Sequence, residues 1–149
     1  MNRVPPLVRS VLAVIAGVII GSLVVGLIEG ANVLLFPPPA GMRYDDPVAM
    51  GAYMAHLPIT AYAVVGLGWM LGALAGGAAA ARVAGRKMAV HGLLVGVILA
   101  VASVMNLVDP SLPAHPVWMW AMALLAAPMG WLGGWLGAWL VARRMRTDV

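Results

Sequence analysis

The chain lacks cysteine altogether, so disulfide bonds, iron–sulfur clusters and thiolate metal sites are excluded. It is also short of charge: Asp, Glu, Lys and Arg make up 9% of its 149 residues, whereas a soluble domain carries roughly 25%. Hydrophobic residues account for 63% of the sequence. Since so few charges cannot coat a globular surface, the composition indicates an integral membrane protein.

Motifs of soluble enzymes are missing as well. The sequence holds no phosphate-binding loop and no dinucleotide fingerprint, and its three histidines show neither HxxxH nor HExxH spacing. The serines Ser22, Ser103 and Ser111 have no recognisable nucleophile setting. Two histidines and an acid could supply three zinc ligands only if the fold brought them together. We therefore expect no catalytic residue and no metal site.

Four apolar stretches reach about 20 residues or more, the length that a helix needs to cross the hydrocarbon core. They run over residues 7–36, 58–83, 88–108 and 116–141. A long connection, 37–57, follows the first stretch, and a short one, 109–115, precedes the last. The predicted fold is all-α: one domain over residues 1–149, built as a bundle of four transmembrane helices.

Positive charge predicts the orientation of these helices. Eight of the nine Lys and Arg residues flank one side of the spans: Arg3, Arg9, Arg82, Arg86, Lys87, Arg143, Arg144 and Arg146. Only Arg43 lies on the other side. The positive-inside rule then predicts a bacterial inner-membrane protein with both termini cytoplasmic and with periplasmic loops at 37–57 and 109–115. Because the basic residues mark span ends, nucleic acid is not an expected partner.

The first span is predicted to be retained. Its apolar run, Val11–Ile28, exceeds the about 7–15 residues of a signal peptide, and no A-x-A cleavage site follows closely.

Small residues recur at four-residue spacing in every span. The seams are Gly17/Gly21, Ser22/Gly26/Gly30, Gly68/Gly72/Gly76, Gly92/Gly96 and Gly130/Gly134. Because lipid supplies no hydrophobic drive for helix association, such glycine-zipper seams predict tight packing. They exceed what one four-helix bundle needs, so we expect a homo-oligomer or other membrane subunits as partners, besides the lipid bilayer.

A tryptophan ridge lies on the last span, on the side away from its glycines: Trp131, Trp135 and Trp139. The ridge is expected to face lipid or another subunit. The alternative is a platform for a ring-shaped lipid, quinone or pigment.

Polar residues gather at the predicted periplasmic end of the helices. They are Glu29, Asn32, His56, Asn106, Asp109 and His115. A helical projection puts Glu29 on the small-residue face, and acidic groups within a bilayer usually face a partner or water. We predict that these six residues line a ligand-binding pocket. The alternative for Glu29 is a structural hydrogen bond to Asn106 or to a neighbouring backbone group.

The long first connection contains a helix signal. Asp46 suits an N-cap and Pro47 suits the first helical turn, so residues 48–56 are predicted to form a short interfacial helix. That helix would either cover the polar pocket or act as a plain connector.

Three segments carry a resemblance to a known family: EGANVLLFPPPAG (29–41), DPVAM (46–50) and HPVWMW (115–120). In these motifs the chain resembles a family of small, uncharacterised bacterial inner-membrane proteins with four predicted spans. The resemblance covers nearly the whole chain and implies that the regions around Glu29 and His115 belong to one unit. It implies no catalytic residue and no cofactor.

The preferred functional hypothesis is a pocket that binds or transports a proton, a cation or a small polar ligand. One alternative is a structural or accessory subunit of a larger membrane complex. The other is a membrane enzyme acting on a lipid-like substrate, with His56 or His115 as general base near Glu29. The sequence favours a non-enzymatic role and identifies no cofactor.

Overall fold

The computed structural model describes residues 5–147, with side chains as far as Arg143. These residues form five α-helices: α1 (Pro6–Leu35), α2 (Pro47–His56), α3 (Ile59–Ala84), α4 (Met88–Leu107) and α5 (Trp118–Thr147). The described part of the chain contains no strand. The all-α prediction is confirmed.

Four of the helices, α1, α3, α4 and α5, are long and apolar enough to cross a membrane. The chain is therefore a multi-pass membrane protein. Predicted and observed boundaries agree within two residues, except that α5 continues to Thr147 instead of ending at Val141. The longer α5 carries the basic residues that were expected to follow the span.

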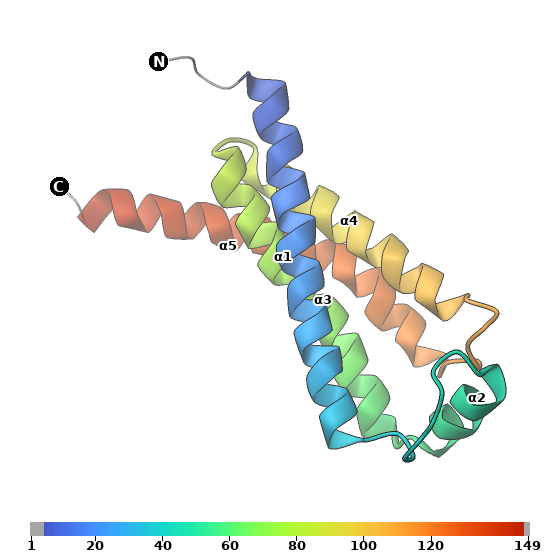
Figure 1. Ribbon diagram of the computed structural model, residues 1–149. Helices are drawn as coiled ribbons and strands as arrows, with labels where there is room; N and C mark the ends of the chain where they lie inside the picture. The colour runs from blue at the N-terminus through green and yellow to red at the C-terminus, as the bar shows by residue number, and fades with distance from the viewer. Residues whose placement is uncertain (1–4, 148–149) are drawn as a thin grey trace.

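Helix α3 lies at the centre of the bundle and packs against α1, α4 and α5. Helices α4 and α5 also run together as a pair, whereas α1 lies mainly on α3 (Figure 1). Helix α2 stands apart from these helices, at the end where the two long loops are found. We refer to that end, residues 36–58 and 108–117, as the loop end, and to the opposite end as the basic end.

Glycines set the distances between the packed helices. A Cβ added at Gly17 would come within 2.7 Å of the Gly76 carbonyl oxygen, and one at Gly21 within 2.9 Å of the Gly72 oxygen. Backbones in such contact gain van der Waals energy that lipid cannot replace. Gly77 meets Gly130 of α5 in the same way.

Helices α4 and α5 use the same device. A Cβ at Gly92 would lie 2.5 Å from the Gly130 oxygen, and one at Gly96 would lie 2.6 Å from the Ala127 oxygen. The predicted small-residue seams of the second, third and fourth spans therefore lie at helix contacts within the chain.

The second seam of α1 does not lie at such a contact. A Cβ added at Gly26 or at Gly30 would have no described side chain and no backbone of another helix within 4 Å. Gly17 and Gly21 are in close contact with α3 and α4. Farther along α1, Val25 and Ile28 still lie against Gly72 and Gly68 of α3, so the second half of α1 stays on α3 and separates from α4. Figure 1 shows this divergence between α1 and α4.

At the basic end, α1 is tied to the turn between α3 and α4. The Arg9 Nε donates a hydrogen bond to the Val83 carbonyl oxygen, 2.8 Å away. This bond satisfies one of the carbonyls that the last turn of a helix leaves free. Gly85 ends α3 at φ 66°, in the left-handed region that glycine adopts without strain.

The loop end carries a capped helix. The Asp46 carboxylate accepts hydrogen bonds from the backbone N–H groups of Val48 and Ala49, and Pro47 occupies the first turn. The predicted cap and short helix are confirmed. The N-cap satisfies backbone N–H groups that the first turn leaves free, and Pro47 has a φ suited to that turn.

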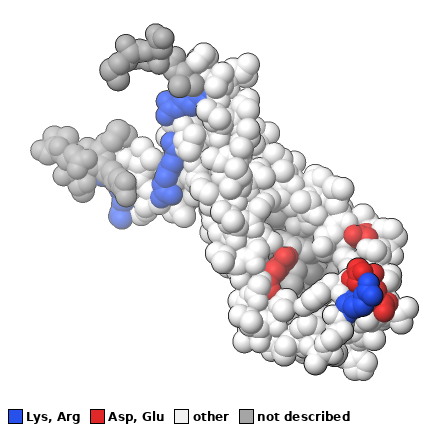
Figure 2. Space-filling model, in the orientation of Figure 1, with Lys and Arg blue, Asp and Glu red and all other residues white. Residues whose placement is uncertain are grey.

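Charge is separated along the molecule. Figure 2 shows basic side chains near the chain termini and acidic side chains toward the opposite end. One basic residue lies among the acids: Arg43, whose guanidinium pairs with Asp45 at 2.7 Å. Arg3 lies outside the described residues, as do the side chains of Arg144 and Arg146.

The glycine contacts predict opposite responses to one added methyl group. Gly77→Ala should lower the thermal unfolding midpoint in maltoside micelles, because overpacking against Gly130 costs about 1–3 kcal/mol. Gly30→Ala is the matched control, since its Cβ meets open space and alanine favours the helix. Equal midpoints for the two variants would contradict this packing.

Candidate functional site

A cleft opens between α1 and α4 where the two helices diverge. We call its first part the helix arm, a cavity of about 250 Å³ floored by Trp69 of α3. Its walls are Ser22, Val25, Gly26 and Glu29 of α1 and Leu99, Ala102, Ser103 and Asn106 of α4. Figure 2 shows this face of the molecule hollowed, with an acidic group beside the hollow.

The second part of the cleft, the loop arm, also measures about 250 Å³ and lies toward α2 and the loop end. It shares Glu29 and Asn106 with the helix arm, so the two arms meet at these residues. The remaining polar and aromatic lining residues are Asn32, Tyr44, Tyr53, Tyr62 and His115. Four of the six predicted site residues therefore lie on one cleft.

Glu29 is half-buried and projects from α1 to α3. Its Oε1 accepts a hydrogen bond from the Trp69 Nε1, 3.3 Å away. The structural alternative, a bond from Glu29 to Asn106, is not formed in the described part of the chain, although both residues line the cleft. Among the described residues, no Lys or Arg lines either arm. The carboxylate is thus held by one neutral donor, with no counter-ion beside it.

Asn32 lies one turn after Glu29 and is buried, with 8% of its surface exposed. Its Oδ1 has no hydrogen-bond partner among the described residues. A buried acceptor without a donor costs about 1–3 kcal/mol. The Asn32 Oδ1 is therefore a buried hydrogen-bond acceptor that no donor among the described residues satisfies.

His115 reaches the loop arm from the connection before α5. Its ring packs edge-on against Tyr62, with ring centroids 6.3 Å apart. The Nδ1 is buried and has no partner among the described residues. Burial lowers the pKa of the His115 imidazole below its usual value, because the charged form loses its hydration.

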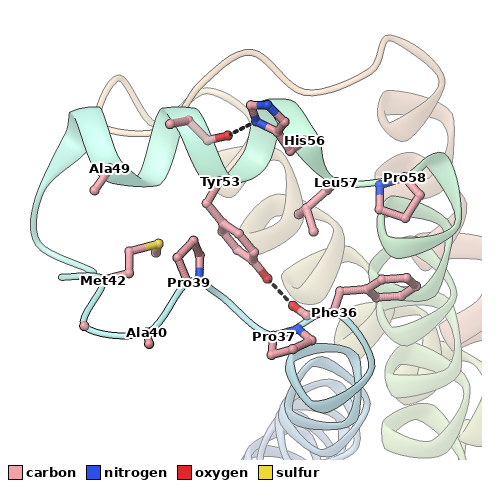
Figure 3. A pocket seen from close by; sticks show the side chains of 12 residues that line it. Phe36, Pro37, Pro39, Ala40, Met42, Ala49, Tyr53, His56, Leu57 and Pro58 are labelled. Atoms are coloured by element: carbon pink, nitrogen blue, oxygen red, sulfur yellow. Dashed lines mark hydrogen bonds between the residues drawn. The ribbon is translucent and has the colours of Figure 1, made fainter.

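His56 is not among the residues that line the cleft. It lines a neighbouring, mostly apolar cavity of about 660 Å³ between α2 and the loop after α1, which shares Tyr53 and Leu57 with the loop arm (Figure 3). Its Nδ1 is 2.7 Å from the Ala52 carbonyl oxygen, one turn back in α2. The last turn of α2 directs this side chain away from the cleft.

Asp109 is also absent from the cleft lining. It is exposed and organises the turn after α4, where its Oδ1 accepts bonds from the Ser111 backbone N–H at 2.8 Å and hydroxyl at 2.6 Å. These bonds lower the pKa of the Asp109 carboxyl. The sequence placed Asp109 at the correct end of α4, but the chain turns before the carboxylate can face inward.

Aromatic residues of the cleft escaped the sequence analysis. Trp69 lies amid the glycines of α3, far from the membrane interface where tryptophans usually gather. A buried indole N–H needs an acceptor, and this requirement was the signal for a polar partner such as Glu29. The three tyrosines of the chain all line the loop arm.

Tyrosine hydroxyls fasten α2 over the loop arm. Tyr53 of α2 donates to the Phe36 carbonyl oxygen at 2.6 Å, across the cavity of Figure 3. Tyr62 of α3 donates to the Met54 carbonyl oxygen at 2.8 Å. Helix α2 is thereby joined to the end of α1 and to the start of α3.

The donor set limits the chemistry of the cleft. Within residues 5–147, no three His, Asp or Glu side chains lie close enough together to hold a metal ion. Glu29 and His115 line the same arm, but the second base of the enzymatic hypothesis, His56, is not with them. The arrangement is suited to binding a hydrogen-bond donor or a positive charge.

Comparisons with known protein families, with curated proteins and with solved structures give no match. The class of the protein therefore follows from its own fold: a four-span, all-α membrane protein with a cleft between α1 and α4.

The state of His115 predicts how stability changes with pH. Because its folded-state pKa is lowered, the unfolded chain binds more protons as the pH falls through about 6.5. Stability in micelles should therefore decrease on going from about pH 7.5 to about pH 5.5. His115→Gln should reduce that decrease, as measured by thermal unfolding at a series of pH values. Parallel curves for the two proteins would show that His115 is not involved.

Proposed function

We propose that this protein binds a small cation or small polar ligand in the α1–α4 cleft, with Glu29 as the anionic group. The observation that supports it is the half-buried carboxylate on a cleft that no described Lys or Arg lines. Ionisable groups within a membrane usually interact with a partner or line a ligand path. Asn106, at the junction of the arms, adds an amide that can orient a bound ligand.

Transport is the extended form of this proposal. A proton or a cation at Glu29 competes with the Trp69 N–H for the same carboxylate, and that contact joins α1 to α3. Binding would therefore weaken one link between two helices, and movement of α1 would also have to shift the contacts of Val25 and Ile28 with Gly72 and Gly68 of α3. Such coupling makes occupancy of the cleft a signal for helix movement.

The proposed location is the bacterial inner membrane, with both termini in the cytoplasm and the loop end in the periplasm. Support comes from the separation of charge: Arg9, Arg82, Arg86 and Lys87 lie toward the basic end, and Arg43 is paired with Asp45. In this orientation the polar end of the cleft opens toward the periplasm. Helix α2 then lies at the periplasmic surface of the inner membrane, where lipid meets water.

An alternative role is a structural subunit of a larger assembly. Trp131, Trp135 and Trp139 are 49%, 54% and 40% exposed on α5, and Gly30 of α1 has open space beside it. Both surfaces could contact a second protomer or another membrane protein. In this role Glu29 only holds α1 to α3 through Trp69, and the cleft has no ligand.

Because the chain has no native cysteine, its orientation can be tested with single introduced thiols. Asp45→Cys should react with a membrane-impermeant maleimide in intact bacterial cells, and Arg86→Cys should react only after permeabilisation. Both positions are exposed, so reactivity reports sidedness. The reverse pattern would place the loop end in the cytoplasm.

Ligand binding can be tested with sodium, potassium and methylammonium ions on the purified chain in maltoside micelles. At least one of these should bind saturably by calorimetry, and Glu29→Gln should weaken it by at least about tenfold, as expected for losing a charged hydrogen-bond partner. Asp45→Asn is the matched control, an exposed acid on no described cavity.

The same titrations separate the two functions. Binding that survives Glu29→Gln, or no binding to the native chain, would reject the ligand site and leave the subunit role.

A further inference from the structure

The helix arm is shaped by the unused seam of α1. Gly26 lines this arm, and nothing in the chain fills the space beside it. Ser22 to Glu29 spans seven residues, so the arm extends about 10 Å along α1 at a rise of ~1.5 Å per residue. Apart from Ser22 and Ser103, the walls before Glu29 and Asn106 are apolar. The arm therefore suits a chain of methylene groups better than a hydrated ion.

The hydroxyl of Ser103 does not change this character. It donates to the Leu99 carbonyl oxygen of its own helix at 2.9 Å, so its donor is already in use. Val25 and Leu99 line the arm on opposite helices.

The polar end of the cleft offers acceptors rather than donors. The Glu29 carboxylate accepts one neutral N–H, and the buried Asn32 Oδ1 accepts none among the described residues. Both residues line the loop arm one helical turn apart. A primary ammonium group carries a positive charge and three N–H donors, so it complements a carboxylate and an unsatisfied carbonyl together.

We propose that the cleft binds a single-chain primary alkylammonium, with its head at Glu29 and Asn32 and its apolar chain in the helix arm. This inference rests on the proposed function and names its ligand class. The alkyl chain of the ligand would enter the helix arm from the bilayer, between the diverging halves of α1 and α4. A free metal ion would leave the apolar arm unused, and the described residues provide no cluster of three ligands for it.

Phospholipids with an ammonium head fit the cleft less well. Their phosphate carries a negative charge beside the ammonium, and among the described residues no Lys or Arg lines either arm to neutralise it. The single-chain amine is therefore the occupant that the charges favour.

The experiment compares octylammonium with methylammonium by calorimetry on the full chain in maltoside micelles, with protein-free micelles as the blank. Octylammonium should bind at least about tenfold more tightly, because buried methylenes add affinity. Gly26→Leu should abolish that advantage, since a helical side chain leans toward the N-terminus and would fill the arm beside Ser22.

Gly30→Leu is the matched control. It adds the same side chain to the same helix, also in open space, but Gly30 does not line either arm. This variant should keep the preference for octylammonium, and thermal unfolding should confirm that both leucine variants are folded.

Each outcome has one meaning. If methylammonium binds through Glu29 but octylammonium binds no more tightly, or if Gly26→Leu and Gly30→Leu behave alike, the alkyl-chain inference is wrong and the proposed function stands. If neither the two amines nor sodium or potassium binds in a way that depends on Glu29, the proposed function fails as well. If phosphatidylethanolamine added to the micelles displaces octylammonium, the occupant is a phospholipid and the single-chain assignment is overturned.

Discussion

Backbone contact at glycine is the constraint on which the rest of this structure depends. In lipid, helices associate only as far as their surfaces fit, because the solvent is as apolar as the side chains. Gly17 and Gly21 fit α1 to Gly76 and Gly72 of α3, and beyond them the fit between α1 and α4 ends. The cleft is the space left where two helices stop touching, so its position is fixed by where the contacts stop.

Polar groups divide into two populations along the same axis. Those in the loops are satisfied locally: Arg43 by Asp45, and Asp109 by Ser111. Those on the cleft are satisfied incompletely, as the Oδ1 of Asn32 shows. The polar groups in the loops thus stabilise turns. An acceptor inside a membrane without a hydrogen bond raises the free energy of the unliganded protein, so it favours binding of a group that donates the missing bond.

Hydrophobic length and end signals predicted the elements of the fold well. Span boundaries, the Asp46 cap and the short α2 follow from rules that act within one segment. The cleft was predicted less well, because its geometry depends on contacts between segments. No local pattern could show that Trp69 would meet Glu29 across two helices, or that the turn of α2 would carry His56 to a different cavity. Four of the six predicted residues line the cleft. Predicting these four required only the correct face of a helix or the correct end of the bundle.

The two tyrosine bonds that hold α2 have a consequence for how the interior can change. Both donors are neutral phenols and both acceptors are backbone carbonyls. Burial raises the pKa of Tyr53 further above neutrality, so this fastening does not respond to physiological acidity. Helix α2 can therefore keep its position over the loop arm throughout the physiological pH range, held to the end of α1 by a bond that carries no charge.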